Sequence, residues 1–430
     1  MNTEDVLKKS KEFLFPAVKS IYPDPMVMTD GAGAWLTDMD GKKYLDFFGG
    51  ILTISVGHAN QEVNDAVYAQ MQRLSHVTTL YPTLPIAELA EKLAGITPGD
   101  LQKCFFTASG TEADETAVMM AQVFTGHSEL IALRHGYSGR SLLAQALTAH
   151  STWRATATQV ATVKHAVSPY CFRCPFKQTY PSCGMACAYD MEELIQTTTV
   201  GEVSGLLAEP IQGVGGFITP PKEYFEIVVD IVRKHGGVFI CDEVQTGFGR
   251  TGKMWGIENY GVEPDMMTMA KGIANGAPLG AVVATAPIAD SLTKNSISTF
   301  GGNPISCTAA TATIDIIKRD KLTENAAAQG RILREGMERM KKDHPKVVGD
   351  VRGMGLMQAI EFVVDETVMD RTPNTAITTA FLQATRERGL LVGKGGLYGN
   401  VIRISPPLNI TADETRQALR LMGEALDAID

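Results

Sequence analysis

The chain has 430 residues, of which 44% are hydrophobic and 20% are charged, and this is the composition of an ordinary soluble globular protein. Its formal net charge of −9 argues against nucleic acid as the main partner, and no apolar run approaches the length that spans a membrane. The first residues show neither a signal peptide nor a transit peptide, so we expect a cytoplasmic location.

Strands and helices alternate through most of the chain. Residues 1–20 predict an amphipathic helical arm, and residues 33–47 predict two strands around a turn. From about residue 60 to residue 315, helical patterns alternate with short apolar runs, which predicts a parallel sheet covered by helices. The expected strands of this sheet are 104–107, 130–133, 206–208, 238–241, 266–270 and 281–284. The remainder changes to an α+β pattern, with strands expected at 356–362 and 401–404.

A helix is predicted to begin directly after the strand at 104–107. Ser109 and Glu112 fit a capping box, and the apolar pattern that follows ends at Gly126. Backbone N–H groups at a helix start can hold a phosphate. By itself, however, this pattern indicates only a helix start.

The seven cysteines do not indicate a disulfide framework in a chain of this length. Cys171, Cys174, Cys183 and Cys187 have the C-x2-C and C-x3-C spacing of metal ligands, so a zinc or iron–sulfur site is one interpretation. The flanking sequence lacks the turns and glycines of a zinc knuckle. We favour the other interpretation, a reduced structural loop that covers the site or contacts a second subunit, without a metal.

Asp242 and Lys271 carry the strongest chemical signal. Residues 238–241 form a short apolar run that predicts a buried strand ending at Asp242, and Lys271 stands at the end of the next strand. Ligands of open α/β sheets collect at the carboxyl ends of strands. An enzyme that uses pyridoxal phosphate (PLP) needs this pair: the lysine forms a Schiff base, and the aspartate keeps the pyridine nitrogen protonated. Each residue has an ordinary alternative, a helix cap or a surface lysine, but the glycines around both favour the cofactor.

Residues 242–252 and the segment 264–272 resemble the signature of class III PLP-dependent aminotransferases, and the similarity runs from about residue 30 to the C-terminus. The resemblance implies an α/β protein of fold type I. A large PLP-binding domain with a mainly parallel sheet flanked by helices is expected at 61–315. A smaller α+β domain is expected from the N-terminal segment 1–60 and the C-terminal segment 316–430.

The resemblance also implies which residues bind the cofactor. Asp242 and Lys271 are joined by residues expected to hold the phosphate, to stack on the ring or to lie against it: Gly110 and Thr111, then Tyr137, then Val244 and Gln245. Gln245 is the expected partner of the phenolic oxygen. Tyr137 has an alternative as an ordinary core residue.

A further residue, Thr299, is expected to reach the phosphate of the neighbouring subunit, which implies a homodimer, or a tetramer, with shared active sites. The chain departs from the family pattern at two positions. Asp114 stands where asparagine is usual, and Ser138 stands where histidine is usual.

Two charged residues are expected at the substrate. By resemblance, Arg403 clamps a substrate carboxylate, a task suited to the planar guanidinium, and Glu209 neutralises Arg403 when no such carboxylate is bound. Gly50 and Tyr81 are expected to line the substrate pocket on weaker motif grounds.

These residues imply a PLP-dependent aminotransferase that moves an amino group from an amino acid or ω-amine donor to a 2-oxo acid, with pyruvate or glyoxylate as acceptor. Lys271 would act as the general base and acid. Similarity is expected to the alanine–glyoxylate, 3-aminoisobutyrate–pyruvate and 4-aminobutyrate branches. The alternative is a PLP-dependent racemase, epimerase or decarboxylating aminotransferase, because these enzymes share Lys271 and Asp242.

Overall fold

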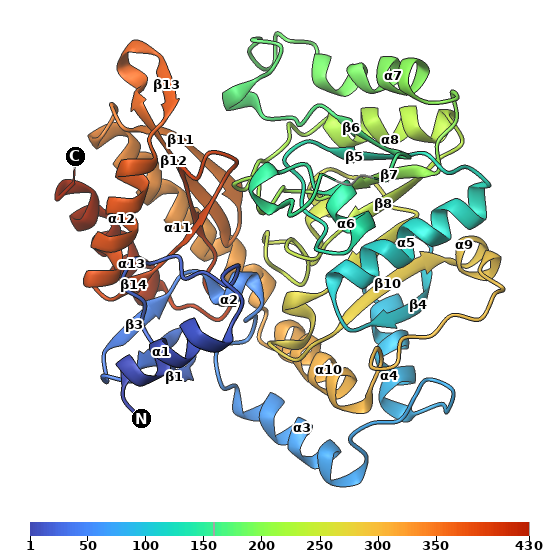
Figure 1. Cartoon of the computed structure of the whole chain (residues 1–430), viewed down its shortest axis with the longest axis horizontal. Coiled ribbons are helices and arrows are strands. Elements are labelled where there is room, and N and C mark those ends of the chain that lie inside the picture. Colours follow the sequence, from blue (N-terminus) through green and yellow to red (C-terminus); the bar gives the residue numbers. More distant parts are fainter. Residues whose placement is uncertain (158–159, 430) are drawn as a thin grey trace.

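In the computed structural model of the chain, which describes residues 1–157 and 160–429, a seven-stranded sheet forms the centre of the larger half (Figure 1). Its strands lie in the order β4 (Leu101–Thr107), β10 (Gly280–Thr285), β9 (Met266–Met269), β8 (Val238–Asp242), β7 (Gly205–Ala208), β5 (Leu130–Leu133) and β6 (Val163–Ala166). The five strands from β9 to β6 are parallel, as predicted.

The strand β10 differs from the predicted parallel pattern, since it runs antiparallel to both β9 and β4. Its connection from β9 contains one short 3-10 turn, η4 (Lys271–Ala274). A parallel crossover needs a dozen or more residues and usually a helix. The chain therefore returns directly and reverses its direction.

Helices cover both faces of this sheet. The helix α5 (Gly110–Thr125) packs on one face, and α8 (Tyr224–Lys234) packs on β7 and β8 from the other. Strand β8 shows how the period of two divides side chains between the faces: Val238 and Ile240 join the α5 cluster, while Phe239 and Cys241 join the core around α8. The remaining helices of this half are α3 (Gln61–Arg73), α4 (Leu84–Ala94), α6 (Leu142–Leu147), α7 (Ala186–Thr198), α9 (Ala286–Ser291) and α10 (Pro304–Arg319). Short 3-10 turns lie at η1 (Ser151–Trp153), η2 (Cys171–Arg173) and η3 (Gly256–Asn259).

The two ends of the chain meet in the smaller half, where blue and red elements lie together in Figure 1. One sheet has the order β1 (Met28–Ala32), β2 (Trp35–Asp38), β3 (Lys43–Asp46) and β14 (Leu390–Leu391). The other has the order β11 (Val348–Met354), β12 (Met357–Asp365), β16 (Val401–Ile404) and β15 (Gly393–Gly395), with β13 (Asp370–Pro373) paired to β12. The helices of this half are α2 (Gly49–Leu52), α11 (Leu322–Asp343), α12 (Thr375–Glu387) and α13 (Ala412–Asp427), and η5 (Glu366–Val368) follows β12. The domain boundaries at residues 60 and 315 stay a prediction.

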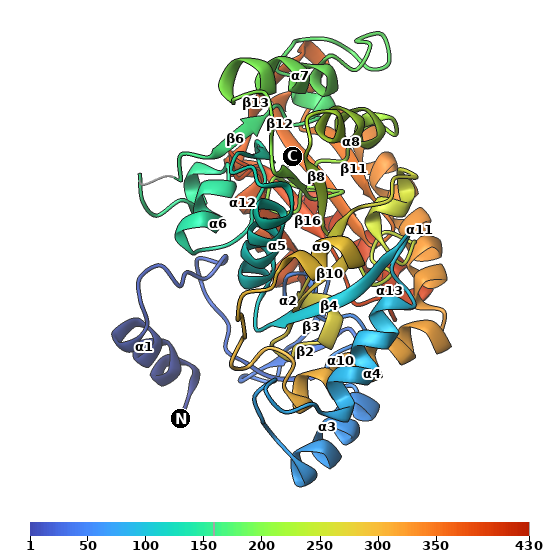
Figure 2. The ribbon, with the colours of Figure 1, turned by 90° about the vertical axis from the view of Figure 1, so that its right-hand side faces the viewer.

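The predicted arm over residues 1–20 is helical only in its first part, α1 (Thr3–Phe13). Pro16 disfavours helical backbone in the residue before it, so the helix ends before it. None of the residues of α1 is buried, and Figure 2 shows the helix standing away from the body of the molecule. The prediction of a helix through residue 20 was therefore wrong beyond Phe13.

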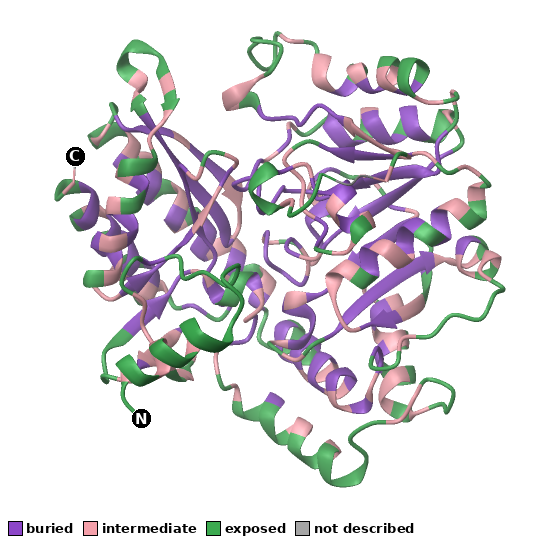
Figure 3. Cartoon of the chain, in the orientation of Figure 1, coloured by how far each residue is buried: buried purple, intermediate pink, exposed green. Residues whose placement is uncertain are grey.

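Burial is concentrated in the central strands of the sheets. Figure 3 shows the central strands in purple, and all residues of β5, β7, β8, β9 and β16 are buried. A fully buried aliphatic side chain contributes about 1.5–3 kcal/mol relative to an exposed one. Any polar group at the ends of these strands is therefore held by a rigid, dry framework.

Glu243, directly after β8, is a buried carboxylate that holds the following turn. It accepts hydrogen bonds from the N–H groups of Gly256 at 2.9 Å and Ile257 at 2.8 Å, and from the hydroxyl of Thr246. Burial raises the pKa of Glu243 to about 7, while these three donors oppose the shift. The contacts join the start of the 242–252 segment to η3, so this residue of the motif has a structural task.

Replacing Glu243 with Gln should lower the free energy of unfolding by about 1–3 kcal/mol, because the amide nitrogen would face a buried N–H donor and leave it unpaired. Chemical denaturation measures this change. The exposed Glu335 on α11 provides the control, since Glu335→Gln should change stability by less than about 0.5 kcal/mol. Equal stability of the two variants would show that Glu243 does not hold the turn.

Candidate active site

The strand register brings the predicted acidic residues and the lysine together. Asp242 is the last residue of β8 and lies opposite Thr268 of β9, three positions before Lys271. Ala208 of β7 lies opposite Cys241, which places Glu209 beside Asp242. Three neighbouring parallel strands therefore end in ionisable side chains at one edge of the sheet, as expected for a ligand site in an open α/β sheet.

A cavity of about 410 Å³ opens at this edge. Most of the predicted site residues line it: Lys271, Asp242, Gly110, Thr111, Tyr137, Val244, Gln245 and Arg403. They come from the start of α5, from the ends of the parallel strands and from β16 of the smaller half. A cavity of this size accommodates a small molecule or cofactor.

Four predicted residues do not line the cavity. Glu209 lies behind the cavity wall, where its carboxylate accepts a hydrogen bond from the backbone N–H of Tyr137, a lining residue. Gly50 is exposed, although its neighbour Ile51 lines the cavity. The side chain of Tyr81 is 65% exposed, and Thr299 is exposed in a separate surface hollow. Within this chain, Gly50 and Tyr81 are therefore not placed against the cavity as expected.

Lys271 follows β9 in a strained conformation. Its φ is 47°, in the left-handed region that residues other than glycine rarely adopt, and such strain clusters at functional sites. Burial lowers the pKa of its amine, while the charges of Asp242, Glu209 and Asp114 oppose this shift. The side chain is thus closer to a neutral amine at pH 7 than an ordinary lysine.

Asp242 is a buried carboxylate with few partners. Its Oδ1 accepts a hydrogen bond from the N–H of Val244 at 2.9 Å, and no ion pair joins it to Lys271 among the residues described. Burial raises its pKa to about 6, while the Val244 N–H and Lys271 lower it. A carboxylate in this state favours a nearby proton donor such as a protonated ring nitrogen.

Glu209 binds backbone groups. Its two oxygens accept hydrogen bonds from the N–H of Tyr137 at 3.2 Å and the N–H of Gly213 at 2.7 Å. Burial and then the charge of Asp242 raise its pKa to about 8, and the two hydrogen bonds oppose them. No ion pair joins Glu209 to Arg403 within the described part of the chain, so in this structure Glu209 fixes the site backbone.

Arg403 presents a fixed cation to the cavity. Its guanidinium lies 5.0 Å from the ring centroid of Phe48 and 5.7 Å from that of Phe217, and its Nε donates to the carbonyl of Lys394 at 3.2 Å. Burial lowers its pKa to about 10, so it stays charged at neutral pH. A guanidinium held in this way suits a carboxylate ligand.

The start of α5 offers donors to an anion. The Ser109 hydroxyl accepts from the N–H of Glu112 at 3.3 Å, whereas the N–H groups of Gly110 and Thr111 have no partner among the described residues. Gly139, with φ of 131°, lies so close that a Cβ there would be 1.9 Å from the Thr111 hydroxyl. This helix of 16 residues therefore presents free N–H groups and its positive dipole end to the cavity.

Other cavity residues had no clear signal in the sequence. Trp153 packs edge-on against Tyr137 with ring centroids 5.5 Å apart, and Val214 lines the same space. Both lie in connecting segments without a strand or helix pattern. Asp114, noted only as a departure from the family, is buried in the lining and accepts from the Thr268 hydroxyl at 2.7 Å; burial and then Asp242 raise its pKa well above the usual range.

The residues present fit PLP. The side-chain oxygen of Gln245 is buried in the cavity wall and has no hydrogen-bond partner among the described residues, which calls for a ligand group. Together with the free N–H groups of α5, the ring of Tyr137 and the carboxylate of Asp242, it matches the polar and aromatic parts of that cofactor. Lys271 supplies the amine that its aldehyde requires.

The cysteine-rich segment lies apart from this site. All seven cysteines are free thiols, and the four spaced like metal ligands line a separate small cavity. Among the described residues, no group of three or more His, Cys, Asp or Glu side chains is arranged to hold a metal ion. In the same part of the chain, no helix has the length and apolar character needed to cross a membrane.

Comparison with known sequences identifies relatives along the whole chain. The family model for class-III aminotransferases matches residues 18–426. A mitochondrial alanine–glyoxylate aminotransferase 2 homologue of Arabidopsis thaliana is 45% identical over 95% of this chain and 84% of its own length. The human mitochondrial alanine–glyoxylate aminotransferase 2 is 37% identical over 98% and 86%. A leucine/methionine racemase of Thermococcus litoralis is 34% identical over 100% and 97%.

Solved structures agree with the sequence relatives. A Bacillus anthracis aminotransferase has a TM-score of 0.92 and 30% identity, covering 99% of this chain and 98% of its own. An amine transaminase from an uncultivated Pseudomonas species, solved in its PLP-bound form, has a TM-score of 0.90 and 31% identity, covering 97% and 99%. The fold type I architecture expected from the sequence is thereby confirmed.

The raised pKa of Glu209 predicts a pH dependence of stability in the cofactor-free protein. A carboxyl group whose folded-state pKa is raised to about 8 stabilises the fold fully below its unfolded pKa of about 4.3, and this contribution is lost as pH rises through 8. Thermal unfolding between pH 5 and pH 8.5 should therefore show a smaller decline for Glu209→Gln than for the parent protein. Identical pH profiles would contradict the buried, protonated state, and Glu335→Gln serves as the exposed control.

Proposed function

The chain belongs to the class-III aminotransferases, and we propose that it transfers an amino group from an amino acid or ω-amine to glyoxylate or pyruvate. The choice of acceptor is supported by the two relatives named as alanine–glyoxylate aminotransferases. The convergence of Lys271, Asp242 and Arg403 on one cavity carries the proposal, because it joins a cofactor site to a carboxylate site.

PLP, when bound, supplies an aldehyde that accepts the amino group and a pyridinium ring that takes up electrons. Asp242 keeps a proton on the ring nitrogen, because a buried carboxylate with one backbone hydrogen bond favours a charged partner. Gly110 and Thr111 bind the phosphate with their N–H groups. Tyr137 holds the ring in place, with its backbone fixed by Glu209 and its side chain by Trp153.

Lys271 moves the proton at the substrate carbon that bears the amino group. Burial lowers the pKa of its amine, which favours its action as a base that takes this proton in one half-reaction and as an acid that supplies a proton to the equivalent carbon in the reverse half-reaction. The left-handed backbone at Lys271 is held by its neighbour, since a Cβ on Gly272 would be 2.8 Å from the Ser55 hydroxyl. The position of the amine is therefore determined by backbone that tolerates little change.

Arg403 binds the carboxylate of the 2-oxo acid and of α-amino donors. The aromatic rings of Phe48 and Phe217 hold the guanidinium in its plane, so that little side-chain freedom is lost on binding. An ω-amine presents no carboxylate beside its reacting carbon. Glu209 accepts hydrogen bonds from two N–H groups, and its negative charge raises the pKa of Arg403 against the effect of burial, which supports the predicted balance between the two residues.

A transfer assay tests the proposal directly. Protein loaded with PLP should convert alanine and glyoxylate to pyruvate and glycine, and its visible absorbance should bleach with alanine and return with glyoxylate. Lys271→Ala should lose at least about 1000-fold in turnover, because it removes the proton-transfer amine and its covalent role. Lys341→Ala on α11 is the control. Racemisation or CO2 release without exchange of the amino group would contradict amino transfer and favour the racemase-like alternative.

Replacement of Arg403 with Gln should raise KM for pyruvate by about 10- to 100-fold, since a charged hydrogen bond contributes about 1.5–3 kcal/mol. The inhibition constant of propionate, an unreactive carboxylate, should rise in parallel. Steady-state kinetics measure both. Unchanged constants for pyruvate and propionate would remove Arg403 from the carboxylate site.

We further propose a homodimer whose sites are shared and a cytoplasmic location. The dimer is supported by exposed apolar side chains on two neighbouring segments: Leu80 (68% exposed), Tyr81 (65%), Ile297 (55%) and Phe300 (64%). The ring of Phe300 lies 5.3 Å from that of His76, which links the two segments. A second copy that covers this face would bring Thr299 towards the partner's cofactor phosphate. The location stays a prediction, and two of the relatives are named as mitochondrial proteins.

Light scattering should give a mass twice the 46.3 kDa of one chain. Thr299→Ala should weaken binding of PLP to the cofactor-free dimer about tenfold, because one hydrogen bond to a charged phosphate is lost. Fluorescence titration with PLP measures this affinity. Thr293→Ala, six positions earlier in the same connecting segment, is the control. A monomeric mass, or equal affinity of the two variants, would contradict the shared site.

A further inference from the structure

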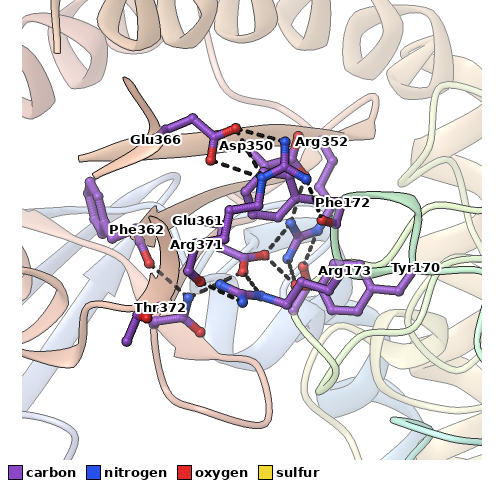
Figure 4. A network of polar contacts seen from close by, with 12 residues as sticks. Tyr170, Phe172, Arg173, Asp350, Arg352, Glu361, Phe362, Glu366, Arg371 and Thr372 are labelled. Carbon is purple, nitrogen blue, oxygen red and sulfur yellow. Dashed lines mark hydrogen bonds and ion pairs between the residues drawn. The ribbon is translucent and has the colours of Figure 1, made fainter. Parts of the chain in front are cut away.

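Charged and polar side chains, most of them buried, form a hydrogen-bonded network outside the cavity (Figure 4). We call this group the Arg352–Glu361 cluster, and its members are Tyr170, Arg173, Asp350, Arg352, Glu361 and Asn400. They come from the cysteine-rich segment, from β11 and β12, and from the residue before β16. No step of amino transfer uses them.

Glu361 is the centre of the cluster. Its carboxylate is fully buried and accepts from Arg352 at 2.6 Å, from the amide of Asn400 at 3.2 Å, and from Tyr170 and Arg173. Arg352 also donates to Asp350 at 2.7 Å, so two guanidinium groups balance two carboxylates. Such a balanced set resists rearrangement, because removing one member leaves an unpaired buried charge.

Arg352 also holds a loop of the active site. Its Nε donates to the carbonyl of Gly216 at 2.9 Å. Gly216 belongs to residues 212–218, here called the site loop, which is closed by hydrogen bonds between Gln212 and Ile218 at 3.0 and 3.3 Å. Gly216 has a φ of 99°, and a Cβ on it would lie 3.0 Å from Val401, so the loop fits tightly against β16.

The site loop contacts Arg403 directly. The carbonyl of Gly213 accepts from a terminal nitrogen of Arg403 at 3.5 Å, and Phe217 supplies one of the two rings beside the guanidinium. Asn400 donates a hydrogen bond to Glu361 and directly precedes β16, the strand that carries Arg403. Glu361 also lies opposite Val401 of β16 in the sheet. The cluster therefore holds Arg403 from two sides, through the loop and through its own strand.

From these contacts we propose that Arg352 is a positioning residue for substrates that bear a carboxylate. It fixes the site loop and the start of β16, and thereby the place of Arg403, without touching the substrate. The inference rests on the proposed carboxylate role of Arg403. Misplacement of a binding group by 1 Å can cost about 100-fold, so a small shift of this arginine has a measurable effect.

The same network contains a matched control. Arg371, in its outer part, binds Glu366 through both carboxylate oxygens and donates to the carbonyl of Phe172 at 3.0 Å. No contact joins it to the site loop within the described residues. Arg371→Lys and Arg352→Lys both keep the charge and remove the planar fork, but only the second removes the donor to Gly216.

The experiment uses the PLP-loaded enzyme and follows amino exchange between 13C-labelled alanine and unlabelled pyruvate, with labelled pyruvate as the measured product. Arg352→Lys should raise KM for pyruvate and the inhibition constant of propionate about tenfold, with kcat changed less than about threefold. Arg371→Lys should change none of these constants, and thermal unfolding is recorded for both. Asn400→Ala removes the hydrogen bond between the start of β16 and Glu361 and keeps that of Arg352 to the site loop, and it should also raise both constants with little change in kcat. This variant replaces Arg352→Lys if Arg352→Lys does not fold.

Arg403→Gln distinguishes the proposed carboxylate site from the positioning role of Arg352. If it leaves the pyruvate and propionate constants unchanged, the proposed carboxylate site is wrong, and the role of Arg352 falls with it. A second outcome is that Arg403→Gln raises the KM for pyruvate and the inhibition constant of propionate, while Arg352→Lys and Asn400→Ala leave both unchanged, as the control Arg371→Lys does. In that case only the positioning role is overturned. A fall in kcat for Arg352→Lys without a change in either constant also overturns it.

Discussion

The structure depends on the burial of ionisable groups at the carboxyl edge of three parallel strands. The charged carboxylates of Asp242 and Glu209 at this edge, and of Asp114 on the neighbouring helix α5, would each be more stable in water, and burial raises the pKa of all three. The cost is offset by backbone donors to Glu209 and Asp242, by a hydroxyl donor to Asp114, and by the charges of Lys271 and Arg403. A site with this charge balance is prepared for a ligand that carries both a cationic ring and an anionic group.

The two halves of the molecule have different tasks at this site. The larger half supplies the parallel strands and the start of α5, where we propose that the cofactor lies. The smaller half supplies Arg403 and, through the buried charges around Glu361, fixes its position against the site loop. Under the proposed function, the cofactor and the substrate carboxylate would thus be held by separate parts of the structure that meet at residues 212–218.

Local sequence patterns predicted the strands and helices around the cavity, whereas the fold type and the expected cofactor residues came from the resemblance to the family. The strand ending at Asp242, the helix beginning at Gly110 and the strand of Arg403 lie where their apolar periods place them. The contacts of Glu209 were not predictable, because the N–H donors of Gly213 and Tyr137 approach it only through the fold. Three further features depend on contacts in the folded chain that leave no periodic signal in the sequence. They are the reversed direction of β10, the place of Trp153 in the cavity wall and the hydrogen bond from Arg352 to the site loop.

The central claim is that the buried amine of Lys271, a residue with a left-handed backbone, is the covalent attachment point of PLP. Reduction of the PLP-loaded protein with borohydride, followed by digestion and peptide mass spectrometry, tests it most directly. We predict that the pyridoxyl group is found on Lys271, at about one group per chain. Modification distributed over exposed lysines, with Lys271 unmodified, would contradict it.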